Sequence, residues 1–170
     1  AGYTIVDPGA YQDGTNDYSA QISQFKSEGV QIFNTFPIPP DFATFWRQAA
    51  QQGLTKQVKI AQIAKTGLFP SQVTALGSIG NNLASACYWH PTWPYKSSLT
   101  NISSKALGAG YTAHSHKQWN QQTGASLALF DVAAAALKAA GDPHDPQAIV
   151  SAMQKLKVEI AGLEERRAQM

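Results

Sequence analysis

The stretch Val30-Gln-Ile-Phe-Asn-Thr-Phe36, followed by Pro37-Ile-Pro-Pro40 and Asp41-Phe-Ala-Thr-Phe-Trp46, decides the fold. Its β-branched and aromatic residues predict a strand over 30–36. The proline-rich segment 37–40 predicts a loop, because proline disfavours both a helix interior and a sheet ladder. Asp41 is then expected to cap a helix that ends at Gly53, with apolar residues at i, i+3, i+4 and i+7 from Phe42 forming one stripe. The stretch is one strand–loop–helix unit.

The same alternation of strands and helices extends on both sides of this unit. Strands are expected at Tyr3–Asp7, at Val58–Ala64 and through Cys87, and helices at about Tyr18–Glu28 and after Pro70. In this pattern Asp17 caps the first helix, and Cys87 is a small buried hydrophobic residue in its strand. Strands that alternate with helices through short loops predict βαβ units and a parallel sheet covered on both faces. Residues 1–94 are therefore predicted to form an α/β lobe.

The character of the chain changes at the stiff aromatic segment Trp89-His-Pro-Thr-Trp-Pro94. Helices are expected at Ser103–Tyr111, at Thr123–Ala140 and from Pro146 onward, with no strand among them. Such helices lack a sheet of their own and are expected to pack on one supplied from elsewhere.

Composition excludes several classes of function. Apolar residues make up 44% and charged residues 14% of the chain, with a net charge of +2, which argues against a disordered chain. No stretch concentrates Lys and Arg, so no nucleic-acid partner is expected. No apolar run reaches the roughly 20 residues that span a bilayer. The lone cysteine allows no internal disulfide.

The search for reactive motifs is negative. The chain contains no Gly-x-Ser-x-Gly elbow, no His-Glu-x-x-His, no phosphate-binding glycine loop and no paired cysteines. We therefore expect no catalytic residue, no cofactor and no enzyme activity. His114 and His116 place two imidazoles close together, but solvated histidines are a better interpretation than a metal site.

The candidate ligand site follows from position in the sheet. In open parallel α/β sheets, ligands bind outside the carboxyl ends of the strands, and two loops of apolar and aromatic character occupy that position here. The predicted ligand-binding residues are Phe36, Pro37, Ile38, Lys65, Thr66, Leu68 and Phe69, with Trp89 and His90 from the irregular segment. The alternative is that Phe36, Ile38 and Phe69 only close the end of the core, and that Trp89 and His90 are hinge packing.

Several short sequence segments, taken together in their order and spacing, resemble the type I periplasmic solute-binding proteins of ABC importers, in the branched-chain amino acid (Leu/Ile/Val) class. These segments are Tyr3-Thr-Ile-Val-Asp-Pro-Gly9, Tyr18-Ser-Ala-Gln-Ile22, Pro37-Ile-Pro-Pro-Asp-Phe-Ala-Thr-Phe-Trp46, Leu68-Phe-Pro70, Cys87-Tyr-Trp-His-Pro91 and Pro94-Tyr-Lys-Ser-Ser-Leu99. Segment 2–94 resembles the second lobe of that family, the last two segments resemble the crossing back to the first lobe, and 123–156 resembles first-lobe helices. The resemblance therefore implies an incomplete second lobe over residues 1–94, a hinge crossing with helices of the first lobe over 95–159, and an atypical charged tail over 160–170. The tail from Ile160 departs from the family.

The resemblance implies two Rossmann-like lobes that close on a small-molecule solute, a periplasmic or extracellular location in a bacterium, no cofactor, and delivery to an ABC permease. It also implies that the chain is a fragment, lacking most of the first lobe and the opening strand and helix of the second. Amino-acid-binding relatives carry an acid in the loop that here reads Lys65-Thr-Gly-Leu-Phe69. A carboxylate or aromatic acid, with Lys65 as its counter-charge, is therefore expected in preference to a plain amino acid.

Three alternatives stay open at this stage. The same fold serves as the ligand-binding region of sensors, which whatever follows Met170 would reveal. An enzyme on an α/β scaffold is disfavoured by the empty motif search. A stranded fragment with no binding of its own is the third, and exposed apolar faces would then drive a homodimer or strand exchange.

Overall fold

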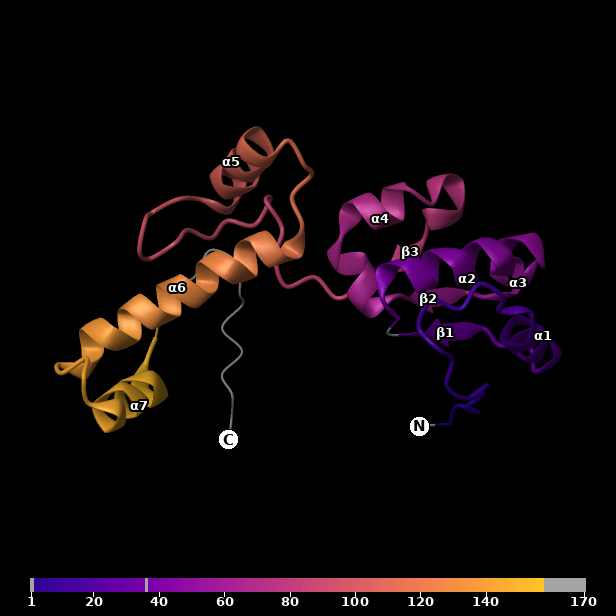
Figure 1. The fold of residues 1–170 in the computed structure, drawn as a ribbon, viewed down its shortest axis with the longest axis horizontal. Coiled ribbons are helices and arrows are strands. Elements are labelled where there is room, and N and C mark those ends of the chain that lie inside the picture. Colours follow the sequence, from indigo (N-terminus) through magenta and orange to yellow (C-terminus); the bar gives the residue numbers. More distant parts are fainter. Residues whose placement is uncertain (1, 36, 158–170) are drawn as a thin grey trace. The chain divides into compact units, whose positions relative to one another are not determined.

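The computed structural model describes residues 2–35 and 37–157 and divides into two compact units, 1–86 and 87–170 (Figure 1). The division falls before the predicted lobe boundary at Pro94. The assignment of residues 1–94, 95–159 and 160–170 to particular lobes stays a prediction, and the tail from Ile160 lies outside the described residues.

The first unit contains a parallel three-stranded sheet in the order β1-β2-β3, formed by Ile32–Asn34, Ile60–Gln62 and Leu83–Ala84. The α/β class with a parallel sheet is confirmed. The expected strand at Tyr3–Asp7 is wrong: this segment has no strand partner among the described residues, and extended backbone without a partner forms no ladder.

The expected strand through Cys87 is too long. It ends at Ala84, and Cys87 is exposed rather than buried. The chain leaves the sheet at Ser85. The hydroxyl of Ser85 donates a hydrogen bond to the carbonyl of Ala64, but its backbone does not extend the strand. The prediction failed because small residues carry no signal for where a short strand stops.

The helices of the first unit are α1 Ser19–Ser27, α2 Pro39–Gln51, α3 Leu54–Gln57 and α4 Pro70–Thr74, with 3-10 turns η1 Ala64–Leu68 and η2 Gly77–Gly80. The N-cap of α1 is Tyr18 and not Asp17 as expected, but the Asp17 carboxylate, one residue earlier, accepts the backbone N–H of Ser19 at 2.9 Å. The expected loop over 37–40 is partly wrong, because α2 begins at Pro39. Proline suits the first helical positions, where no intrahelical N–H bond is needed.

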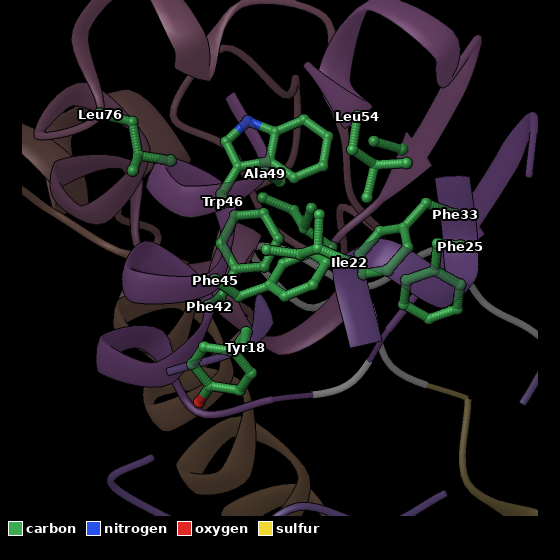
Figure 2. Packing of buried hydrophobic residues seen from close by; sticks show 12 residues of the cluster. Tyr18, Ile22, Phe25, Phe33, Phe42, Phe45, Trp46, Ala49, Leu54 and Leu76 are labelled. Atoms are coloured by element: carbon green, nitrogen blue, oxygen red, sulfur yellow. The ribbon is translucent and has the colours of Figure 1, made fainter. Parts of the chain in front are cut away.

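The core of the first unit is an aromatic cluster between α1, α2 and one face of the sheet (Figure 2). Its buried members are Tyr18, Ile22, Phe25, Phe33, Phe42, Phe45, Trp46, Ala49, Leu54, Ala61, Ile63 and Leu76. Phe33 of β1 stacks on Phe45 of α2 with ring centroids 5.1 Å apart. The Trp46 indole N–H donates to the carbonyl of Ile79 at 2.7 Å. The predicted stripe on α2 is thus confirmed as core.

The other face of this sheet is open within the described residues, which corrects the expectation of two covered faces. Ile32 and Ile60 are register partners on β1 and β2, and both are exposed. Parallel sheets ordinarily bury both faces. The two isoleucines are therefore an apolar pair that the first unit itself does not cover.

The second unit contains α5 Ser104–Ser115, α6 Gln121–Ala140 and α7 Pro146–Lys155. No strand occurs between 87 and 157, apart from one isolated bridge between Lys96 and Ser103, which agrees with the helical expectation. The side chain of Ser103 caps α5 by accepting the N–H of Ala106. The helices leave Leu129, Phe130, Leu137, Val150 and Met153 exposed.

Helix α6 is long and apolar enough, by length and composition alone, to pass as a membrane span, although no uninterrupted apolar run predicted one. Its Asp131 is 1% exposed and accepts hydrogen bonds from the Ser97 hydroxyl at 2.7 Å and the Leu99 N–H at 3.1 Å. A buried carboxylate that is hydrogen-bonded to the loop at Ser97 and Leu99 is the pattern of a helix packed in a protein.

Candidate functional site

The loop that follows β2 is built on an unusual backbone turn. Ala64 has a φ of 33°, which places a residue with a Cβ in the left-handed region. Contacts to β3 hold the loop on both sides of this residue: the Ile63 N–H donates to the Ala84 carbonyl at 2.8 Å, and the Ser85 hydroxyl donates to the Ala64 carbonyl at 2.9 Å. The loop is therefore fixed to the sheet at the carboxyl end of β2.

The predicted binding residues of this loop differ in burial. Lys65 is exposed, whereas Thr66 is 1% exposed, and its hydroxyl has no hydrogen-bond partner among the described residues. Leu68 and Phe69 are partly buried where the loop enters α4. The turn thus combines a free ammonium, an orphaned hydroxyl and apolar side chains within five residues.

The loop that follows β1 lies beside a cavity of about 180 Å³. Of the predicted residues here, Pro37 is buried and lines this cavity, Ile38 is the N-cap of α2, and Phe36 lies outside the described residues. The cavity is lined mostly by aromatic and turn residues from the N-terminal segment, α1, β1 and α2: Pro8, Gly9, Tyr11, Tyr18, Gln21, Phe25, Phe33, Asn34, Thr35, Pro37, Asp41, Phe42 and Phe45. Phe33, Asn34 and Thr35 place it at the carboxyl end of β1.

Sequence reasoning missed the polar groups of this cavity. The expectation that Asp41 caps α2 is wrong, because the N-cap is Ile38; Asp41 is 4% exposed, and its carboxylate accepts the N–H of Gly14 at 3.1 and 3.3 Å. The Tyr18 hydroxyl is buried, with no partner among the described residues. Burial, and secondarily the negative charge of Asp41, raise the pKa of Tyr18 to about 12. Contacts across 27 residues, such as Asp41 to Gly14, leave no local sequence signal.

The two predicted residues of the irregular segment belong to the second unit. Trp89 is fully buried, and its indole lies against Gly124 of α6 and Gly108 of α5. His90 is partly buried and forms an edge contact with Trp119, with its Nδ1 2.7 Å from the Thr92 hydroxyl oxygen. These contacts give Trp89 a packing role, and a ligand-binding role for either residue stays a prediction.

No cluster of three or more His, Cys, Asp or Glu side chains suited to a metal ion occurs in the part of the chain that the structure describes. His114 and His116 are both exposed, the first in α5 and the second as its C-cap.

Residues 1–168 match the sequence family described as periplasmic binding protein. The chain belongs to the periplasmic binding protein family. Its parallel sheet and helices have the type I fold of that family, as two solved structures also indicate. No match was found among curated proteins.

The first structure is a leucine-binding protein, LivK, from Thermotoga maritima, with a TM-score of 0.70 and 21% identity over 90% of this chain. The second is a periplasmic binding protein type 1 from Bordetella pertussis Tohama I, with a TM-score of 0.64 and 14% identity over 91% of this chain. At these identities the likeness is one of fold. This periplasmic binding protein chain spans 42% and 43% of those two chains.

Proposed function

We propose that this chain is part of the extracytoplasmic solute-binding component of a bacterial ABC importer, and that it contributes one wall of a site for a small organic acid without transforming it. Family membership over residues 1–168 supports the solute-binding role. The finer choice of ligand rests on one observation: Lys65, exposed in the turn after β2, carries a positive charge. Its neighbour in sequence, Thr66, has a buried hydroxyl with no hydrogen-bond partner among the described residues.

The chemistry of this turn favours a carboxylate over an α-amino acid. The ammonium of Lys65 donates to carboxylate oxygens and repels an α-ammonium group, which needs a negatively charged or other acceptor, and residues 64–69 contain no acid. Ile38, Leu68 and Phe69 are partly exposed and Pro37 lines the cavity, and these apolar side chains are proposed to contact the body of the ligand. Phe36 stays a predicted contact outside the described residues. No general acid or base is assigned, so the proposed role is binding and delivery to a membrane permease.

The test is calorimetric titration of the whole chain with benzoate and isovalerate, and with L-phenylalanine and L-leucine as the amino acid counterparts. We expect the simple acids to bind more tightly. Lys65→Gln should weaken benzoate binding about tenfold, as the loss of a charge-assisted hydrogen bond would. The matched control is Lys59→Gln, which removes an exposed lysine of the same unit and should leave the affinity unchanged.

Tighter binding of the amino acids would overturn the assignment of ligand class. Binding of none of the four would favour a chain that cannot bind without the rest of its parent protein. For the importer role, an ABC permease in liposomes should show ATP hydrolysis that depends on both the binding protein and its ligand.

A further inference from the structure

A single side chain, Ser85, contacts the Lys65 loop at two points. Ser85 follows the last residue of β3, and its hydroxyl lies 2.9 Å from the carbonyl oxygen of Ala64 and 3.2 Å from that of Ala86. The first bond holds the peptide unit that directly precedes Lys65. Ala64 needs such support, because an alanine at positive φ is strained and persists only where surrounding contacts impose it.

The second point of contact is Gly67. A Cβ placed on Gly67 would lie 2.1 Å from the Ser85 Cβ and 2.2 Å from its hydroxyl oxygen. Both distances are too short for atoms that are not bonded to each other. The φ of Gly67 is not in the left-handed region, so the position requires glycine for space and not for conformation. Ser85 therefore seats directly against the backbone of the loop.

The two contacts bracket Lys65 and Thr66. The hydrogen bond fixes residue 64 and the close packing fixes residue 67, while Lys65 between them stays exposed. We propose that Ser85 and Gly67 are a positioning pair, which sets the direction in which the turn presents Lys65 to a ligand carboxylate. This inference rests on the proposed binding role of Lys65. Neither member of the pair is proposed to touch the ligand.

The first measurement needs no ligand. Backbone amide relaxation by NMR on the whole chain should show that Ser85→Ala increases the mobility of 64–68 and leaves β1 and α2 unchanged. The matched control is Ser27→Ala, which removes another hydroxyl-to-carbonyl bond of 2.9 Å in the same unit and should leave 64–68 unaffected. If the backbone mobility of residues 64–68 is the same in Ser85→Ala as in the wild type, Ser85 does not fix the loop and the proposed pair is wrong.

A compensating variant separates the steric contact from general damage. Gly67→Ala should displace the loop, because its new Cβ has no room beside Ser85. Adding Ser85→Gly removes both clashing atoms, and the double variant should return to the relaxation profile of Ser85→Gly alone. A double variant as disturbed as Gly67→Ala would contradict the proposed contact.

The second measurement is benzoate affinity. Ser85→Ala should weaken benzoate binding about three- to tenfold, and by less than about twofold when Lys65→Gln is already present, because the pair acts through Lys65. An unchanged affinity in Ser85→Ala, or equal losses with and without Lys65, would leave a purely structural contact and overturn the positioning role. If the wild-type chain binds none of the four ligands, it cannot bind without the rest of its parent protein, and if it binds the amino acids more tightly, the assigned ligand class is wrong. In both cases the relaxation measurements still decide whether the pair fixes the loop.

Discussion

The two units differ in how much of its own apolar surface each one buries. The first unit has a sheet, two long helices over one face, and a core of twelve buried residues, half of them aromatic. The second unit has three helices and no strand within its described residues, and Trp89 is its one large side chain that is fully buried. Leu129 and Phe130 of α6 are 68% and 64% exposed. A unit with its own sheet can form a core, whereas helices without one leave an apolar face that needs another surface.

The largest effect should come from breaking the core of the first unit. Phe42→Ala removes a fully buried ring that stacks on Trp46, and should cost about 3–5 kcal/mol of unfolding free energy. Denaturant unfolding with hydrogen exchange would measure the loss and locate it in residues 2–86. The matched control is Phe130→Ala, the same change at an exposed position of the second unit, which should cost about 0.5 kcal/mol or less. Equal losses would contradict the contrast between the units.

The next prediction concerns the packing of Trp89 against Gly124 in the second unit. Gly124→Ala places a Cβ 2.0 Å from the indole ring, and such overpacking should cost about 1–3 kcal/mol. Gly110→Ala in α5 is the control, because its Cβ meets no atom within 4 Å and alanine favours a helix by roughly 0.5–1 kcal/mol over glycine. Thermal melts followed by tryptophan fluorescence would compare them. A Gly124→Ala variant as stable as wild type would show that Trp89 is not held there.

The exposed apolar face of α6 should cause the chain to self-associate. We expect the isolated chain to form dimers or larger assemblies in light scattering, because contiguous apolar surface seeks cover. Leu129→Gln with Phe130→Gln should shift the population toward monomer with little change in stability. Leu99→Gln, an exposed leucine outside α6, serves as the control. A monomeric wild-type chain at high concentration would disprove this expectation.

The last effect is a pH dependence of the stability of the first unit, assigned to Tyr18. A tyrosine with a raised pKa in the folded state keeps its stabilising contribution below the unfolded value of about 10 and loses it as pH rises toward 12. Tyr18→Phe should therefore flatten the decline in stability between pH 10 and 12, as urea unfolding at several pH values would show. An identical decline in the variant would assign the dependence to other groups.

Local sequence was sufficient for the elements with strong periodicity. The stripe from Phe42 to Ala49 predicted the buried face of α2, and Gly29 and Gly53 marked helix ends that adopt the expected positive φ. Elements that depend on a neighbour were less predictable. Tyr3–Asp7 has the composition of a strand, but a strand exists only when another pairs with it.

The candidate site divides in the same way. Its proposed location at the carboxyl ends of β1 and β2, with Lys65 as the proposed partner of a carboxylate, was predicted from the order of elements and from residue types, and stays a prediction; the structure adds that Lys65 is exposed. The strain at Ala64, the orphaned hydroxyls of Thr66 and Tyr18, and the bond from Ser85 were not predicted. Features of this kind depend on contacts between groups far apart in the sequence. The Ser85 hydroxyl bonds the Ala64 carbonyl across 21 residues, and the Asp41 carboxylate accepts the Gly14 N–H across 27 residues.

The sequence by itself thus determined the α/β class, the order of the helices and the lack of a catalytic motif, because these reside in local periodicity and residue chemistry. Only the tertiary structure decided which faces are covered. Ile32 and Phe33 are neighbours in one strand, yet Phe33 is core and Ile32 is exposed. The physical reason is that burial is a property of pairs of surfaces, and one chain segment specifies only its own side of each pair.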